Sequence, residues 1–192
     1  MAADVLLVVA AYLVGTFPTA ILVGRRTGVD PTTEGSGNPG ASNVYRTSGR
    51  RAGAIVAIGD VLKGLLPTVA GLLVGGRPLG FACWVSAVLG HIAPATRRFR
   101  GGKGVATAAV GALVLLPLVA ACGAVIFVVV LTVTKTASLA SIAMFVTGPF
   151  LVLLFGRPAW EFAVSAAVSV IVLARHWENV KRLAAGTELG LE

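Results

Sequence analysis

The chain has 192 residues, of which 56% are hydrophobic and only 12% charged, and its formal net charge is +8. Soluble domains have about 45–50% apolar and about 25% charged residues, so this composition excludes a soluble globular enzyme. Its apolar residues come in long runs, and roughly 20 of them in a helix span a bilayer core. The sequence therefore predicts an all-α polytopic membrane protein.

The apolar runs predict transmembrane helices over 4–24, 52–75, 79–95, 138–156 and 159–174. The run 105–133 is too long for one simple span and short for two, and Pro117 or Gly123 can break it. We expect two short crossings here. This gives about seven transmembrane helices in a single domain over 1–192, with short re-entrant or broken helices.

The distribution of basic residues predicts the orientation. Arg25 and Arg26 follow the first apolar run and hold its end in the cytoplasm, since basic residues collect on that side. If 105–133 crosses twice, the basic residues of the later loops also become cytoplasmic. The sequence therefore predicts an external N-terminus, a cytoplasmic C-terminus and cytoplasmic glycine-rich loops.

The first polar motif is EGSGNPGASNVYR, over 34–46. Glycines allow backbone amides to turn toward an anion, Ser36 and the asparagines add donors, and Arg46 offers a bidentate fork for phosphate. A tight turn before a helix is the competing interpretation of its glycines.

The second motif is FRGGKGVAT, over 99–107, where a loop enters an apolar helix. Amides at a helix N-terminus bind anions, and Lys103 adds a positive charge. It is not a Walker A loop, because Arg97 stands where the first glycine belongs and Gly104 where Ser or Thr would bind magnesium. The motif predicts an anion site that does not bind nucleotide.

Two further polar segments lie at helix ends. Ser138 and Ser141 begin one helix, and Ser138 is either an N-cap or a ligand-binding residue. His176 and Asn179 follow the last helix one turn apart, and His176 can serve as a general base or as a donor to phosphate.

Three ionisable residues fall inside or at the end of apolar runs. Asp60 and Lys63 form an i, i+3 pair that we expect to be mutually neutralising and structural, and His91 is expected to be packed. The sequence has no catalytic triad and no metal-ligand cluster, so we expect no metal or cofactor. Its several anion-binding elements suit phosphate-bearing substrates handled by positioning and electrostatics.

In order and spacing, GSGNPGASNVYR, DVLKG, GHIAP, FRGGKGVAT, SLAS and RHWENVKRLAAGTE resemble the bacterial acyl-phosphate:glycerol-3-phosphate acyltransferases, the PlsY family. The resemblance implies a seven-helix enzyme that moves a fatty acyl group from acyl phosphate to the sn-1 hydroxyl of glycerol 3-phosphate, giving lysophosphatidic acid and inorganic phosphate. It further implies a site on the cytoplasmic side of the bacterial inner membrane.

The resemblance also implies roles for individual residues. The residues expected to act in catalysis are Ser36, Arg46, Lys103, His176 and Asn179, and together with Ser141 they are expected to bind the two phosphates. Gly101, Gly102 and Gly104 are expected to give backbone amides to the acyl phosphate. The full set expected to bind substrate is Gly37, Asn38, Asn43, Gly101, Gly102, Gly104, Thr107, Ser138 and Ser141. Either His176 or the phosphate of glycerol 3-phosphate removes the hydroxyl proton.

The expected partners are glycerol 3-phosphate, a long-chain acyl phosphate and membrane lipids, with no nucleic acid, and we expect a monomer. A small-anion or lipid transporter is the alternative function, because broken helices and the intramembrane Asp60–Lys63 pair also occur in carriers. An inactive paralogue that acts as a scaffold is a third possibility.

Overall fold

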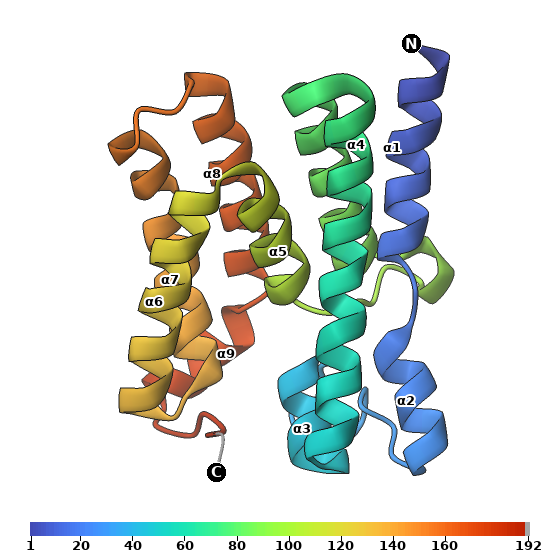
Figure 1. Ribbon diagram of the computed structural model, residues 1–192. Helices are drawn as coiled ribbons and strands as arrows, with labels where there is room; N and C mark the ends of the chain where they lie inside the picture. The colour runs from blue at the N-terminus through green and yellow to red at the C-terminus, as the bar shows by residue number, and fades with distance from the viewer. Residues whose placement is uncertain (191–192) are drawn as a thin grey trace. The chain divides into compact units, whose positions relative to one another are not determined.

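The computed structural model describes residues 1–190, and these contain nine α-helices, one short 3₁₀ helix and no strand (Figure 1). The chain divides into two compact units, Met1–Leu115 and Leu116–Glu192. In unit 1 the elements are α1 (Ala2–Gly15), α2 (Thr19–Thr27), α3 (Ala41–Ser48), α4 (Arg50–Ile92), η1 (Ala95–Arg97) and α5 (Val105–Leu115). In unit 2 they are α6 (Pro117–Thr134), α7 (Ala137–Leu154), α8 (Ala159–Ala174) and α9 (Trp177–Ala184).

The first apolar run is broken, whereas the sequence predicted one helix over 4–24. α1 ends at Gly15 and α2 begins at Thr19, with Pro18 between them. Proline lacks the N–H that a continuous helix would use and disfavours helical backbone in the residue before it, which favours a break at this point. The prediction of a continuous helix was therefore wrong at its middle.

The predicted helices over 52–75 and 79–95 form a hairpin within α4 (Figure 1). Helical backbone is interrupted at Gly75 and at Gly76, whose φ of +66° is a left-handed conformation that favours glycine. The two arms then pack closely, since a Cβ on Gly71 would lie 2.7 Å from the carbonyl oxygen of Leu79. α4 ends at Ile92, three residues before the predicted end.

α1 packs against the second arm of α4. The Ser86 hydroxyl donates to the carbonyl of Val8 at 2.7 Å, and the Tyr12 hydroxyl donates to the carbonyl of Ala93 at 2.7 Å. The same Tyr12 oxygen accepts the Ala95 amide at 2.9 Å. Tyr12 thus holds the chain as it leaves α4 toward the loop that carries Lys103.

α6, α7 and α8 pack in sequence in unit 2. The run 105–133 is interrupted at Leu116 and α6 starts with Pro117, so the predicted break lies at the first of its two candidate positions, while two membrane crossings stay a prediction. Side chains such as Val125, Val129 and Leu154 are more than half exposed, which fits surfaces that face lipid.

Four helices of residues 1–190 are long and apolar enough to cross a membrane, or five if the bent pair α8 and α9 is one span. One of the four is Arg50–Arg97, which includes the hairpin that reverses at Gly75 and Gly76. α5 is apolar but has only 11 residues, about 16 Å of helix. The chain is an integral membrane protein, as predicted.

Candidate active site

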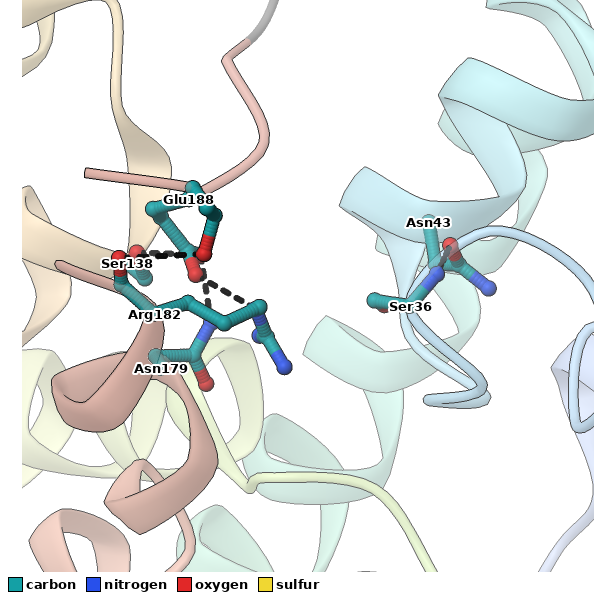
Figure 2. Close-up of polar contacts among 7 residues, drawn as sticks. Ser36, Asn43, Ser138, Asn179, Arg182 and Glu188 are labelled. Carbon is teal, nitrogen blue, oxygen red and sulfur yellow. Dashed lines mark hydrogen bonds and ion pairs between the residues drawn. The ribbon is translucent and has the colours of Figure 1, made fainter. Parts of the chain in front are cut away.

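In unit 1, Asn43 organises the loop that carries Ser36. Its side-chain oxygen accepts the Ser36 amide at 2.8 Å (Figure 2). Its side-chain nitrogen donates to the carbonyls of Pro31 at 3.0 Å and Glu34 at 2.9 Å. The side chain is buried, and both of its amide hydrogens are used within the loop. Asn43 therefore supports Ser36, and contact between Asn43 and substrate stays a prediction.

The rest of the first motif is partly accessible. Gly37 has a left-handed φ of +67°, while Asn38 is half-buried. Arg46 is half-buried in the last turn of α3.

Before this motif, hydrogen bonds from the side chain and then the backbone of Thr32 lower the pKa of the Asp30 carboxyl. The loop before α3 is thus held by side-chain bonds to its backbone.

The GGKG segment is docked on the end of α4 by its backbone. The Gly101 amide donates to the carbonyl of Ile92 at 3.1 Å, and the Gly102 amide donates to the carbonyl of His91 at 3.1 Å. A Cβ on Gly101 would collide with those carbonyls, and one on Gly102 would collide with the His91 ring. These glycines permit a close approach, and their amides are used inside the protein rather than offered outward.

Lys103 lies half-buried between this docked pair and α5. Gly104 has a φ of +83°, which turns the chain into the helix. The Thr107 hydroxyl, fully buried in the first turn of α5, donates to the backbone carbonyl of Asp60 at 2.9 Å. Lys103 therefore lies between two segments that are hydrogen-bonded to α4, the Gly101–Gly102 pair and the first turn of α5. The N-terminal amides of α5 belong to that first turn, next to Lys103 in the chain.

The intramembrane pair of the sequence analysis is present. Lys63 Nζ donates to Asp60 Oδ1 at 2.7 Å, and both side chains are buried, so the predicted pairing is confirmed. His91 is also buried, as expected, and its Nδ1 lies 3.6 Å from the same Asp60 oxygen. The Asp60 carboxylate also interacts electrostatically with Arg97 of η1, so four ionisable groups gather near the GGKG segment.

In unit 2, the Glu188 carboxylate accepts hydrogen bonds from Arg182 and from two predicted site residues, Ser138 and Asn179 (Figure 2). Its Oε1 accepts the Ser138 hydroxyl at 2.8 Å and the Asn179 side-chain nitrogen at 2.6 Å. Its Oε2 accepts Arg182 Nε at 2.7 Å in an ion pair. The sequence analysis missed this role of Glu188, although the residue closes the RHWENVKRLAAGTE motif. That position was the available signal.

The environment of Glu188 favours its charged form. Burial acts to raise the pKa of the carboxyl, but the hydrogen bonds from Asn179, Ser138 and Arg182 together outweigh it and hold the pKa below its ordinary value. Asn179 is itself buried, and its side-chain oxygen has no hydrogen-bond partner among the described residues. That oxygen is an acceptor held in place by the bond from its nitrogen to Glu188.

The other predicted residues of unit 2 are buried at helix ends. Ser138 lies inside α7, whose N-cap is Thr136, so the N-cap interpretation of Ser138 was wrong. The Ser141 hydroxyl donates to the Ala137 carbonyl at 2.8 Å. His176 Nδ1 is 2.8 Å from the carbonyl of Val172, and because a carbonyl only accepts, Nδ1 carries the proton. In the neutral ring Nε2 is then basic.

The predicted residues thus fall into two sets, one in each unit. In unit 1, Ser36 is bonded to Asn43, and Thr107 links α5 to Asp60. In unit 2, Ser138 and Asn179 share the Glu188 carboxylate. Among residues 1–190 no group of three or more His, Cys, Asp or Glu side chains has an arrangement that could hold a metal ion.

Comparison with known proteins identifies the family. The sequence model described as Glycerol-3-phosphate acyltransferase matches residues 5–186. A Glycerol-3-phosphate acyltransferase of Geotalea daltonii is 42% identical over 189 residues, 98% of this chain and 97% of the relative. One from Rubrobacter xylanophilus is 41% identical over 186 residues, 96% of this chain and 94% of the relative.

Two solved structures are also similar. One is the glycerol 3-phosphate form of PlsY (YgiH), an integral membrane glycerol 3-phosphate acyltransferase, with a TM-score of 0.94 and 31% identity, covering 99% of this chain and 96% of that one. The other is its lysophosphatidic acid form, with a TM-score of 0.90 and the same identity and coverage. The chain belongs to the glycerol-3-phosphate acyltransferase family.

Proposed function

We propose that this protein is a membrane acyltransferase that moves a fatty acyl group from acyl phosphate to the sn-1 hydroxyl of glycerol 3-phosphate. The observation that carries the proposal is the family match over residues 5–186. This range includes all the polar motifs, apart from Thr187 and Glu188 at the end of the motif RHWENVKRLAAGTE. The related structure titled as the glycerol 3-phosphate form supports the acceptor, and the lysophosphatidic acid form supports the product.

The reaction needs positioning, charge stabilisation and one proton acceptor. The hydroxyl oxygen of glycerol 3-phosphate attacks the acyl carbonyl carbon and forms an ester bond. The bond from that carbon to the phosphate oxygen breaks, and inorganic phosphate leaves with the electron pair. Because the donor is already an activated anhydride, cationic side chains and oriented amides can supply most of the rate enhancement.

In unit 1, Ser36, Arg46 and Lys103 are proposed to contact phosphate oxygens, with Gly37 and Asn38 lining the loop. The amides of Gly101 and Gly102 are committed to α4 carbonyls, so we assign the anion-binding amides to Gly104 and the first turn of α5. Asn43 and Thr107 then act by fixing Ser36 and α5.

In unit 2, His176 and Asn179 are proposed to meet the reacting hydroxyl. The buried Asn179 oxygen is an acceptor and therefore suits a hydroxyl better than a phosphate oxygen, which also accepts. His176 Nε2 is basic in the tautomer set by the Val172 carbonyl. Proton removal by His176 and proton removal by the substrate phosphate are both compatible with this arrangement. Ser138 and Ser141 complete the predicted substrate-binding set.

We further propose that 1–192 acts as one acyltransferase domain with about seven membrane crossings, an external N-terminus and cytoplasmic glycine-rich loops. Unit 1 supports this orientation, because the Thr27 hydroxyl is 3.3 Å from that of Ser48 and so the arginine pairs 25–26 and 50–51 lie at the same end of the unit. The proposed location is the bacterial inner membrane, and the proposed state is a monomer that acts on long-chain acyl phosphate.

The test is transfer of label from glycerol 3-phosphate into chloroform-extractable product by purified protein. Palmitoyl phosphate and palmitoyl-CoA are compared as donors, with donor-free proteoliposomes as a control for anion flux. Product with acyl phosphate alone is the expected result. Product with neither donor from folded protein, or glycerol 3-phosphate flux without any donor, would overturn the proposal in favour of a scaffold or a transporter.

A further inference from the structure

We propose that the buried cluster of Asp60, Lys63 and His91 is a positioning element for Lys103, fixing the segment 101–107 at both of its ends. The inference rests on the proposed function, since it assigns the cluster a part in catalysis. The alternative is a purely structural role, in which Asp60 and Lys63 only neutralise each other within an apolar helix.

The first end of the segment is fixed through His91. Its backbone carbonyl accepts the Gly102 amide at 3.1 Å, and its ring fills the space that a Cβ on Gly102 would need. The ring is buried, with Nδ1 3.6 Å from Asp60 Oδ1. The orientation of the ring that supports Gly102 is therefore coupled to the Asp60 carboxylate.

The second end is fixed through the backbone of Asp60. Its carbonyl accepts the Thr107 hydroxyl at 2.9 Å, and both residues are buried. One turn on, the contact between α4 and α5 is close, since a Cβ on Gly64 would collide with the Thr107 carbonyl. The first turn of α5 cannot shift without disturbing this contact.

Asp60 thus serves both ends, and Lys63 holds its carboxylate in place with a 2.7 Å hydrogen bond. Lys103 lies between the two fixed points. A buried charge pair is costly to keep and is often replaceable by apolar residues without loss of stability. A pair kept only for structure would therefore be dispensable, whereas one that orients His91 would not.

The decisive variant is the double substitution Asp60→Leu with Lys63→Met, which removes both charges but leaves the residue 60 carbonyl for Thr107. We expect a modest loss of thermal stability, because Arg97 also interacts with the removed carboxylate, and a loss in kcat on the order of 100-fold, with smaller changes in either KM. Amide hydrogen exchange in the peptide 99–107 should become faster, because the support of Gly102 is loosened.

The matched control is Glu161→Gln, which neutralises another buried carboxylate, paired with Arg157 at 2.8 Å at the start of α8. It should reduce stability and leave kcat per folded enzyme and exchange in 99–107 unchanged. A double variant with wild-type kcat and wild-type exchange would overturn the positioning role.

If the double variant does not fold, Asp60→Asn with Lys63→Met carries the test, since it removes both charges with a smaller change of shape and keeps the residue 60 carbonyl for Thr107. Lower kcat with faster exchange would support the proposal, and wild-type values of both would overturn it. Absence of product from wild-type protein would instead refute the proposed function. The exchange measurement would still decide whether the cluster holds the segment.

Discussion

The two units hold their candidate site residues by different means. In unit 1, the GGKG segment is fixed by backbone hydrogen bonds to the end of α4 and by close contacts that leave no room for a side chain. In unit 2, Ser138, Asn179 and Arg182 are fixed by one carboxylate, that of Glu188.

This difference predicts different sensitivities. A segment docked by its backbone has no room for added volume, because packed interiors yield little. A cluster built on a carboxylate depends on the ionisation of that group and hence on pH. The following substitutions test each half of this comparison.

The largest effect is expected for the cations of unit 1. Lys103→Ala or Arg46→Ala should reduce turnover by about 100- to 1,000-fold, because each removes a positive charge proposed to stabilise phosphate in the transition state. The measurement is kcat with acyl phosphate and glycerol 3-phosphate, with size-exclusion chromatography in detergent to verify folding. Retained activity in both variants would contradict the assignment.

The next effect is expected for Gly101→Ala. The new Cβ would collide with the carbonyls of His91 and Ile92, so the segment must move and turnover should fall by on the order of 100-fold. Gly148→Ala is the matched control, because nothing lies within 4 Å of its Cβ position in α7. The control should be neutral or stabilising by up to about 1 kcal/mol. Equal behaviour of the two variants would refute backbone docking.

A moderate, pH-dependent effect is expected for Glu188→Gln. At pH 7 the variant should lose about 2–3 kcal/mol of stability, since the carboxylate accepts bonds in the folded protein. The folded pKa of Glu188 lies below its ordinary value of 4.5, so its stabilisation is present above that pH and is lost as pH falls through the folded pKa. Thermal unfolding from pH 7 downward should therefore show the two proteins converging. A constant difference would contradict this view.

The smallest effect is expected for Ser138→Ala, which removes one hydroxyl donor to Glu188 and leaves the bonds from Asn179 and Arg182. The loss should be about 1 kcal/mol of stability. Thermal unfolding at pH 7 measures it, with Ser141→Ala as the comparison because its hydroxyl bonds within α7. A Ser138→Ala loss as large as that of Glu188→Gln would show that the carboxylate does not organise the cluster.

The sequence predicted the helical class, separate helices over 52–75 and 79–95, a break within 105–133 at Pro117 or Gly123, and the Asp60–Lys63 pair. Each of these depends on a local property: apolar length, a glycine pair, a proline, or a charge pair one turn apart. The break at Pro18 was also visible in the sequence, but the apolar length of the run concealed it.

The non-local contacts of the site were not predictable from the pattern. Glu188 lies 50 residues from Ser138 in the chain, and nothing in their spacing indicates that they meet. Similarly, the glycines of 101–104 indicated exposed amides, whereas two of those amides turn inward to carbonyls of α4. Which way a glycine-rich backbone faces depends on tertiary packing rather than on composition.

The central claim is that the acyl group leaves phosphate and enters an ester of glycerol 3-phosphate, and the most direct test follows the donor phosphate. Purified protein is given acyl phosphate with radiolabelled phosphorus together with unlabelled glycerol 3-phosphate. The account predicts one labelled inorganic phosphate for each lysophosphatidic acid formed, and none without glycerol 3-phosphate. Labelled phosphate released without the acceptor, or label retained in the lipid product, would contradict it.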